Sequence, residues 1–156
     1  MEIIIADLQH LWDIQNLSKK LFLDDFNNYD TTLDIDRSHS KQATDFFTWL
    51  IKDPNSCIFL AIESNSVVWY ICWWIYPLVS RRKGFENIGE LYNIFVEEKY
   101  RNKNIGWELY TELTKWFQTK NINRVRVSAS AWNISAINFY KKHWFNNYIS
   151  ILEQEI

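Results

Sequence analysis

Residues 90–106, ELYNIFVEEKYRNKNIG, contain the pattern that decides the fold of this chain. A β-rich run ends at Val96, a short polar turn follows, and apolar residues at helical spacing begin near Ile105. The first backbone N–H groups of a helix have no partner inside the helix and carry the positive end of its dipole. A strand, a tight turn and a helix in this order therefore predict a place where a phosphate can bind.

Two features of the turn favour an anionic ligand. Gly106 and Asn104 let a ligand approach the backbone, because glycine lacks a side chain and asparagine tolerates a left-handed conformation. Arg101 and Lys103 add positive charge. The same residues are also typical of a solvent-exposed connection that binds nothing, so the turn alone leaves both interpretations open.

A second informative stretch is AWNISAINFYKKHWF, residues 131–145, which predicts a helix that opens at Asn133 and carries Tyr140 in its body. A phenol stays protonated at neutral pH and can donate a proton to a departing thiolate. The competing interpretation is a tyrosine that packs its ring in the core and leaves its hydroxyl at the edge.

The remaining periodicities predict alternating strands and helices around one sheet. Expected strands lie at residues 2–6, 57–63, 67–76, 86–96, 124–130 and 147–152, and expected helices at 8–23, 41–51, 105–117 and from 133. Residues 24–36 are predicted to form an acidic loop, and 64–66 and 80–84 to form turns. The pattern indicates an α+β fold with a mixed sheet, antiparallel across hairpins and parallel across helices, in a single domain covering residues 1–156.

Composition excludes several classes of function. The net charge of −2 argues against a nucleic-acid-binding protein. Cys57 and Cys72 lie in apolar strands without metal-ligand spacing, which predicts two buried thiols in a reducing cytoplasm and no metal site. The N-terminus does not resemble a signal peptide, and the most apolar run, residues 67–76, is too short to span a membrane as a helix.

Together, ELYNIFVEEKYRNKNIG and SASAWNISAINFYKKHWF (residues 128–145) resemble the GNAT acetyltransferases, which move an acetyl group from acetyl-CoA to an amine. The family pattern is Arg-x-x-Gly-x-Gly after a strand, then Asn-x-x-Ala-x-x-Phe-Tyr, then Gly-Phe. The matching positions here are Arg101, Gly106, Asn133, Ala136, Phe139, Tyr140 and Phe145. The string WNISAINFYKK is most similar to the diamine and polyamine acetyltransferase branch.

The resemblance implies a GNAT fold: six to seven mostly antiparallel strands, about four helices, and two splayed parallel strands, residues 91–96 and 125–130, that hold acetyl-CoA. The pantetheine arm is expected to pair with backbone groups of Ile94, Phe95 and Val96 and to form a hydrogen bond with Asn133. Ala136 is expected to bind the cofactor as well. The pyrophosphate is expected at Arg101, Asn102, Lys103, Asn104, Ile105, Gly106 and Trp107. Tyr140 is the expected general acid for the CoA sulfur. No metal is implied.

On the acceptor side, the resemblance makes Glu90 the expected general base, with Tyr92, Asp24 and Asp25 as expected substrate-binding residues. The expected acceptor is a small cationic amine: a polyamine, diamine, amino acid or aminoglycoside-like compound. Glu90 is equally interpreted as a solvated strand-end carboxylate, and the acidic residues as a solvated loop. The polyamine branch has acidic residues further along this strand, where this chain has Tyr92 and Asn93.

Two other functions fit the same residues. One is acetylation of a protein amine or of aminoacyl-tRNA, which a basic patch on the acceptor face would favour. The other is an idle module that binds acyl-CoA without turnover. The resemblance also leaves open whether the chain acts as a monomer or as a homodimer, and it implies no membrane partner.

The chain has nine tryptophans and three glycines, and several tryptophans stand where the family usually has glycine. Trp144 follows a helix, at a position where a left-handed residue is expected and glycine has no steric penalty. Trp69 and one of Trp73 and Trp74 stand in the central strand at positions where the family usually has glycine, and the same question applies to Trp107 in the expected pyrophosphate turn. We hypothesise that these are UGA codons that the source organism reads as glycine; UGG codons there would instead indicate a genuinely tryptophan-rich core.

Overall fold

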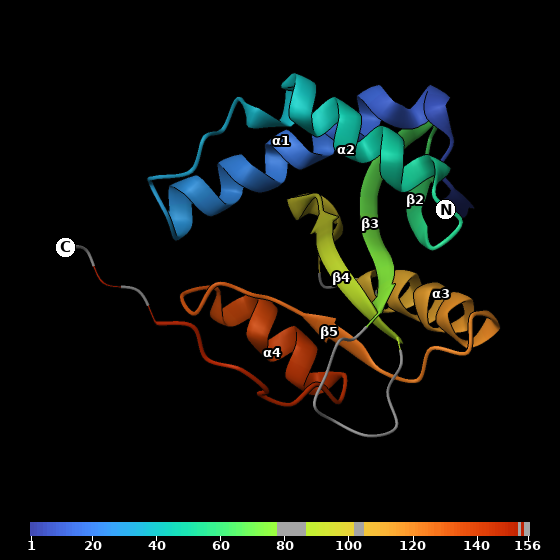
Figure 1. The fold of residues 1–156 in the computed structure, drawn as a ribbon. Helices are drawn as coiled ribbons and strands as arrows, with labels where there is room; N and C mark the ends of the chain where they lie inside the picture. Colours follow the sequence, from blue (N-terminus) through green and yellow to red (C-terminus); the bar gives the residue numbers. More distant parts are fainter. Residues whose placement is uncertain (78–86, 102–104, 153, 155–156) are drawn as a thin grey trace.

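The computed structural model describes residues 1–77, 87–101, 105–152 and 154, and it shows helices on both faces of one sheet (Figure 1). The strands are β1 Glu2–Ile5, β2 Ser56–Glu63, β3 Ser66–Pro77, β4 Asn87–Val96 and β5 Val125–Val127. The α-helices are α1 Leu11–Asn28, α2 Lys41–Lys52, α3 Ile105–Thr119 and α4 Ile134–Lys142; 3-10 turns lie at Leu8–His10, Arg37–His39 and Glu98–Tyr100. The predicted turn at 80–84 and the turn residues 102–104 lie outside the described residues.

The sheet has the order β1-β2-β3-β4-β5, antiparallel between the first four strands and parallel between β4 and β5. Ser64 and Asn65 turn the chain from β2 to β3 with φ of 50° and 64°. Two consecutive left-handed residues are typical of a type I′ hairpin, so the predicted turn at 64–66 is confirmed. The α3 crossover makes β5 parallel to β4, because a helix returns the chain to the same end of the sheet.

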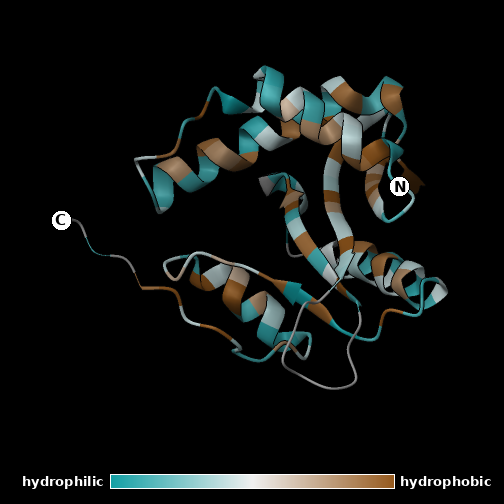
Figure 2. Cartoon of the chain, in the orientation of Figure 1, coloured by the Kyte–Doolittle hydropathy of each residue, from teal (hydrophilic) through white to brown (hydrophobic). Residues whose placement is uncertain are grey.

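Each face of the sheet packs against its own pair of helices. Tyr70 and Cys72 of β3 face α1 and α2, whereas Trp69 and Trp73 face α3 and α4. This alternation follows from the period of two along a strand. Hydrophobic segments also recur along each helix between polar ones (Figure 2), as expected for helices with one buried face.

Residues 24–28 are helical, so the prediction of a loop over residues 24–36 was wrong for its first five positions. The amide of Tyr29 donates to the carbonyl of Asp25 at 2.8 Å, and the side-chain amide of Asn28 donates to the carbonyl of Asp24 at 2.7 Å. Aspartate lowers helix propensity by less than about 1 kcal/mol per residue. The hydrogen bonds of the last turn are kept despite that cost, and α1 continues to Asn28.

The sheet has five strands within the described residues, fewer than the six to seven expected. The predicted strand at 147–152 is wrong, because that segment forms no ladder with a described strand. It contacts β5 and the residue before it through Tyr148, whose ring lies 5.0 Å from the Arg124 guanidinium and 5.1 Å from that of Arg126. Leu152 is 93% exposed, so no apolar face holds the segment on the sheet. The strand predicted at 124–130 is shorter than expected, because residues 128–130 turn into α4.

Trp144 adopts φ of 71° immediately after α4, as the sequence predicts for this position. The amide of Trp144 donates to the carbonyl of Lys141 at 3.2 Å, and the amide of Phe145 donates to the carbonyl of Tyr140 at 3.1 Å. These two bonds form a Schellman motif, and the Phe145 ring packs on the Tyr140 ring at 5.5 Å. The motif requires a left-handed residue at Trp144, where glycine alone fits without strain.

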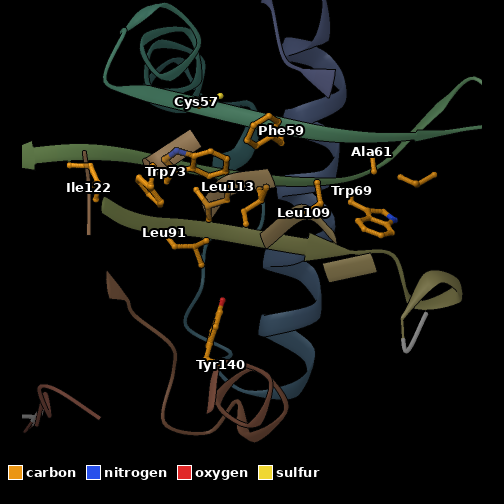
Figure 3. Packing of buried hydrophobic residues seen from close by; sticks show 13 residues of the cluster. Cys57, Phe59, Ala61, Trp69, Trp73, Leu91, Leu109, Leu113, Ile122 and Tyr140 are labelled. Carbon is orange, nitrogen blue, oxygen red and sulfur yellow. The ribbon is translucent and has the colours of Figure 1, made fainter. Parts of the chain in front are cut away.

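Two other tryptophans carry an energetic penalty. Trp69 and Trp73 are fully buried, and neither indole N–H has a hydrogen-bond partner among the described residues (Figure 3). A buried donor without a partner costs about 1–3 kcal/mol. The position of Trp144 and these two N–H groups keep the glycine hypothesis open as a prediction.

We predict that Trp144→Gly stabilises the protein. The indole of Trp144 is 88% exposed, so its loss removes little packing, whereas glycine relieves about 1 kcal/mol of backbone strain. Urea unfolding of the purified variant measures the change in the free energy of unfolding. Trp132→Gly is the matched control, because Trp132 is also exposed but does not have a positive φ. Equal effects of the two substitutions would contradict the strain argument.

Candidate functional site

The candidate site begins where β4 and β5 separate. Their parallel pairing covers Gly89 with Val125, Glu90 with Arg126 and Leu91 with Val127, and it stops there. Beyond Leu91, within the described residues, β4 keeps its pairing with β3 but has no strand on its other side. Backbone groups on that side of residues 92–96 are therefore open to a ligand that adds to the sheet as a strand.

A β-bulge lies at the point of separation. Leu91 pairs with Trp73 and Asn93 pairs with Cys72, so Tyr92 is an extra residue in β4. A bulge bends its strand and increases the local twist. It also turns Tyr92 and Asn93 to the same face: Tyr92 packs on Trp74 at 5.3 Å, and the Asn93 amide donates to the Tyr70 hydroxyl at 3.2 Å.

Tyr140 approaches the same point from the other face. Its side chain rises from α4 with the hydroxyl directed toward β4 at Leu91 (Figure 3). The residue is buried, and its hydroxyl makes no hydrogen bond to a described residue. Burial raises the pKa of the Tyr140 phenol, because the anion is poorly solvated there. A protonated hydroxyl that can still donate a hydrogen bond thus lies beside the separating strands.

The first turn of α3 meets both β4 and α4. A Cβ atom placed on Gly106 would lie 3.3 Å from Phe139 Cε2 and 3.9 Å from Ile94 Cδ1. Glycine at this position lets the amino end of α3 approach α4 closely, so the structure brings three predicted cofactor-binding elements together. The predicted turn residues Asn102, Lys103 and Asn104 lie outside the described residues.

Asn133 and Ala136 form the start of α4. The Asn133 side-chain oxygen accepts a hydrogen bond from the Ala136 amide at 2.9 Å, which is an N-cap. The Asn133 oxygen is thus used inside the helix, and its NH₂ group is the part available to a ligand. Trp107 stacks on His143 at 4.1 Å, over the carboxyl end of α4.

Arg101 is held at the end of β4 by two protein groups. Its Nε donates to the Val96 carbonyl at 3.1 Å, and its Nη2 lies 3.0 Å from Asp24 Oδ2. The structure therefore pairs a predicted cofactor-binding cation with a predicted substrate-binding acid. The side chain of Phe95 is buried against α1 and α2, whereas those of Ile94 and Val96 pack on the α3–α4 side. The Phe95 backbone lies opposite Tyr70 of β3.

Glu90 belongs to a polar cluster that crosses three strands on the α1–α2 side. The Tyr76 hydroxyl donates to Glu90 Oε2 at 3.2 Å and accepts from Arg126 Nη1 at 3.2 Å. Burial raises the pKa of the Glu90 carboxyl, whereas the Tyr76 hydrogen bond and the Arg126 charge act against that rise. The carboxylate is half-buried and oriented by Tyr76.

Two adjoining cavities of about 150 Å³ and 370 Å³ lie between α1, the segment before α2 and β4. Phe22, Arg37 and Tyr92 line both of them. The inner cavity is also lined by Ser18, Ser38, Gln42, Ala43, Phe46, Phe47 and Asn93, and the outer one by Thr32, Leu33 and Asp34. Tyr92, a predicted substrate-binding residue, thus lies at the wall of a hollow, two residues along β4 from Glu90.

The other two predicted substrate-binding residues lie on the last turns of α1 and line neither cavity. Asp24 pairs with Arg101. Asp25 is half-buried, and this burial raises the pKa of its carboxyl, with the nearby Asp24 charge as the second cause. The Asp24 carboxylate therefore lies beside the end of β4, and neither aspartate lines the hollow where Tyr92 lies.

Sequence reasoning missed Arg37, Tyr76 and Arg126. Arg37 directly follows the acidic stretch, which dominated the interpretation of that segment. The two partners of Glu90 lie 14 and 36 residues away from it in sequence, so only the strand register brings them together. The alternation in RVRV did place Arg126 on one face of its strand, which is the signal that points to it.

Within the described part of the chain, no group of three or more His, Cys, Asp and Glu side chains is placed to hold a metal ion. No helix among these residues is long and apolar enough to cross a membrane.

Comparison with known proteins identifies acetyltransferases both by family model and by curated relative. The family model described as "Acetyltransferase (GNAT) family" matches residues 13–145. The L-ornithine N5-acetyltransferase NATA1 of Arabidopsis thaliana is 30% identical over 116 residues, which are 67% of this chain and 49% of that protein. The chain thus spans about half the length of the curated relative it matches.

Two solved structures show the same fold. The tetramutant of the BH1408 protein from Bacillus halodurans has a TM-score of 0.86 at 11% identity and full coverage of both chains. A predicted acetyltransferase from Clostridium acetobutylicum, solved with acetyl-CoA, has a TM-score of 0.81 at 18% identity, covering 99% of this chain and 95% of that one. At such identities the likeness concerns the fold.

We predict that Arg126→Gln raises the pKa of Glu90. The Arg126 cation favours the ionised carboxylate, so its removal shifts the equilibrium toward the protonated form. A ¹³C NMR titration of the Glu90 carboxyl measures the change. Arg124→Gln removes the same charge two residues earlier and serves as the control, with a smaller expected shift. An unchanged or lower pKa of Glu90 in Arg126→Gln would show that the cluster does not control this carboxyl.

Proposed function

The chain belongs to the acetyltransferase (GNAT) family, and we propose that it transfers an acetyl group from acetyl-CoA to a primary amine of a small cationic acceptor. The observation that carries this proposal is the open side of β4 over residues 92–96 beside the buried Tyr140 hydroxyl. The open side of β4 offers backbone groups to the pantetheine arm of acetyl-CoA, and the Tyr140 hydroxyl offers a proton to its sulfur.

The arm of acetyl-CoA adds to the open side of β4 as a short extra strand. Backbone groups of Ile94, Phe95 and Val96 provide the hydrogen bonds, and an amide in this segment polarises the thioester carbonyl as an oxyanion hole does. The NH₂ group of Asn133, next to Ala136 at the start of α4, donates to the arm.

The amino end of α3 binds the pyrophosphate. The first N–H groups of a helix have no partner within it, and Gly106 keeps side-chain atoms away from the backbone there. The proposed pyrophosphate-binding residues are Arg101, Asn102, Lys103, Asn104, Ile105, Gly106 and Trp107. Arg101 keeps a donor for the phosphates, because Nε and Nη2 are the atoms that contact Val96 and Asp24 and the Nη1 group is used by neither contact.

Glu90 acts as the general base. The acceptor amine is protonated in water and must lose a proton before its nitrogen can attack the thioester carbon. The raised pKa of Glu90 makes its carboxylate a better proton acceptor than a solvated one, and Tyr76 fixes its orientation. The proton passes directly or through water.

Tyr140 acts as the general acid. When the tetrahedral intermediate collapses, the carbon–sulfur bond breaks and the sulfur takes the proton of the Tyr140 hydroxyl, while the attacking nitrogen releases its remaining extra proton to water. The products are the N-acetylated amine and free CoA thiol. The Tyr140 phenolate regains its proton from solvent, which its raised pKa favours.

For the acceptor we propose a class of compounds, small cationic primary amines, rather than one compound. A polyamine, a diamine, an amino acid and an aminoglycoside-like amine all present a primary amine, and the curated relative is named for acetylation of L-ornithine at N5. We place the reaction in the cytoplasm, because the free and buried Cys57 and Cys72 suit a reducing compartment. A homodimer is compatible with this activity.

Thiol release tests the proposal. Purified protein is mixed with acetyl-CoA and a panel of primary amines, and free thiol is followed with a chromogenic disulfide. Acetyl transfer to at least one amine supports the proposed function. CoA binding without turnover on any amine would instead support the idle acyl-CoA-binding module.

Tyr140→Phe is expected to lower kcat by about 10²-fold or more, because the leaving sulfur loses its proton donor. Steady-state kinetics on the best acceptor measure the effect. Tyr29→Phe, at the end of α1, is the matched control and is expected to keep the wild-type kcat. A Tyr140→Phe variant with the wild-type kcat would remove Tyr140 from the acid role.

Glu90→Gln is expected to lower kcat/KM by about 10²-fold and to remove the fall in activity at acid pH. The sign follows from the base role: Glu90 works when ionised, so wild-type activity is lost as the pH drops through a pKa that lies above the ordinary glutamate value. A pH profile of kcat/KM, from mildly acidic to mildly alkaline buffer, measures this. If the variant keeps the same acid limb, another group is the base.

A further inference from the structure

We propose that the acceptor carries a carboxylate in addition to its reactive amine, and that Arg37 binds this carboxylate. The acceptor is then an amino acid with a second amine on its side chain, rather than a polyamine. This inference rests on the proposed function, because it assigns the acceptor of that same site.

Arg37 is held in place at the wall of both acceptor-side cavities. It begins the 3-10 turn Arg37–His39, and the buried Ser38 fixes that turn to α1. The Gln15 side-chain amide donates to the Ser38 carbonyl at 3.1 Å, and the Ser38 hydroxyl donates to the Ser18 hydroxyl at 3.3 Å. The backbone that carries the guanidinium is therefore fixed before any ligand binds.

The guanidinium has no protein counter-ion within the described residues, although acidic residues surround it in sequence. Lys19 forms an ion pair with the Asp36 carboxylate at 2.8 Å, and Arg101 forms one with the Asp24 carboxylate at 3.0 Å. Asp30 accepts hydrogen bonds from Thr32 in its own turn. Most carboxylates of the acidic stretch therefore already have hydrogen-bond or ion-pair partners within the protein, which weakens the predicted attraction of a polycation. The charged side chain that lines the inner cavity is the cation Arg37.

The outer cavity contains charges of both signs, because Asp34 lines it together with Arg37. One Asp34 oxygen accepts the Asp36 amide at 3.1 Å, which leaves the other oxygen available. A guanidinium and a carboxylate in one hollow complement an α-carboxylate and an α-ammonium group. A ligand with two or more positive charges and no anion meets Arg37 as a repulsive neighbour.

The apolar surface between this hollow and Glu90 suits an aliphatic chain. The Phe46 ring packs on Tyr92 at 5.0 Å, and the Trp74 ring packs on Tyr92 at 5.3 Å. Trp74 lies opposite Glu90 in the sheet, so the aromatic surface leads from the cavities toward the proposed base. Arg37 and Tyr92 line both cavities together, so the guanidinium belongs to the hollow that adjoins this aromatic surface.

The test compares acceptors that differ only by the carboxylate: lysine with cadaverine, and ornithine with putrescine. Wild-type protein is expected to show a kcat/KM at least about tenfold higher for each diamino acid, as a charge-assisted bidentate bond requires. In Arg37→Gln this ratio is expected to fall by about tenfold or more, mainly through KM. Lys52→Gln, an exposed charge change at the end of α2, is the control and is expected to keep the wild-type ratio.

Binding measurements keep this test separate from the test of acetyl transfer. Titration calorimetry of CoA-saturated wild-type protein with lysine and with cadaverine needs no turnover, and lysine is expected to bind at least about tenfold more tightly. A protein that favours the diamines in both assays overturns the proposal even if it is an active acetyltransferase. A ratio that Arg37→Gln leaves at the wild-type value, in a variant with wild-type circular dichroism, also overturns it.

Discussion

The separation of β4 from β5 after Leu91 is the constraint on which the site depends. Parallel strands remain paired as long as both keep their register, and here two local features end that pairing. The bulge at Tyr92 bends β4, and residues 128–130 turn away into α4. Beyond Leu91, β4 is therefore the edge of the sheet within the described residues, and a ligand of extended shape can satisfy the backbone groups that it leaves without a strand partner.

The same separation divides the chemistry between two faces of the sheet. Tyr140 approaches from the side of α3 and α4, whereas Glu90 and the two cavities lie on the side of α1 and α2. A thioester placed between the strands would thus have the proposed proton donor on one face and the proposed base on the other. The two groups have different surroundings, apolar for Tyr140 and polar for Glu90.

Local sequence patterns predicted the hairpin at 64–66, the start of α3 at Ile105 and the left-handed Trp144, because each depends on a few neighbouring residues. Family resemblance predicted the fold. Neither could predict the cluster of Glu90 with Tyr76 and Arg126, which exists only through strand register.

Two further differences between sequence and structure have physical reasons. Arg37 was missed because its place among the charges becomes visible only once the partners of the nearby aspartates are known. The segment 147–152 contacts β5 through Tyr148 but forms no ladder with it, because its exposed Ile151 and Leu152 make no buried apolar contacts that would hold it on the sheet. Contacts between distant segments, rather than local preference, decide both cases.

The central claim is that acetyl-CoA binds as an added strand on the open side of β4. Amide hydrogen exchange, measured residue by residue by NMR with and without saturating acetyl-CoA, tests it most directly. The claim predicts that amides of residues 92–96 that exchange rapidly in the free protein slow by about tenfold or more on binding, since they acquire hydrogen-bond partners. Saturation with acetyl-CoA that leaves every one of these amides unchanged would contradict it.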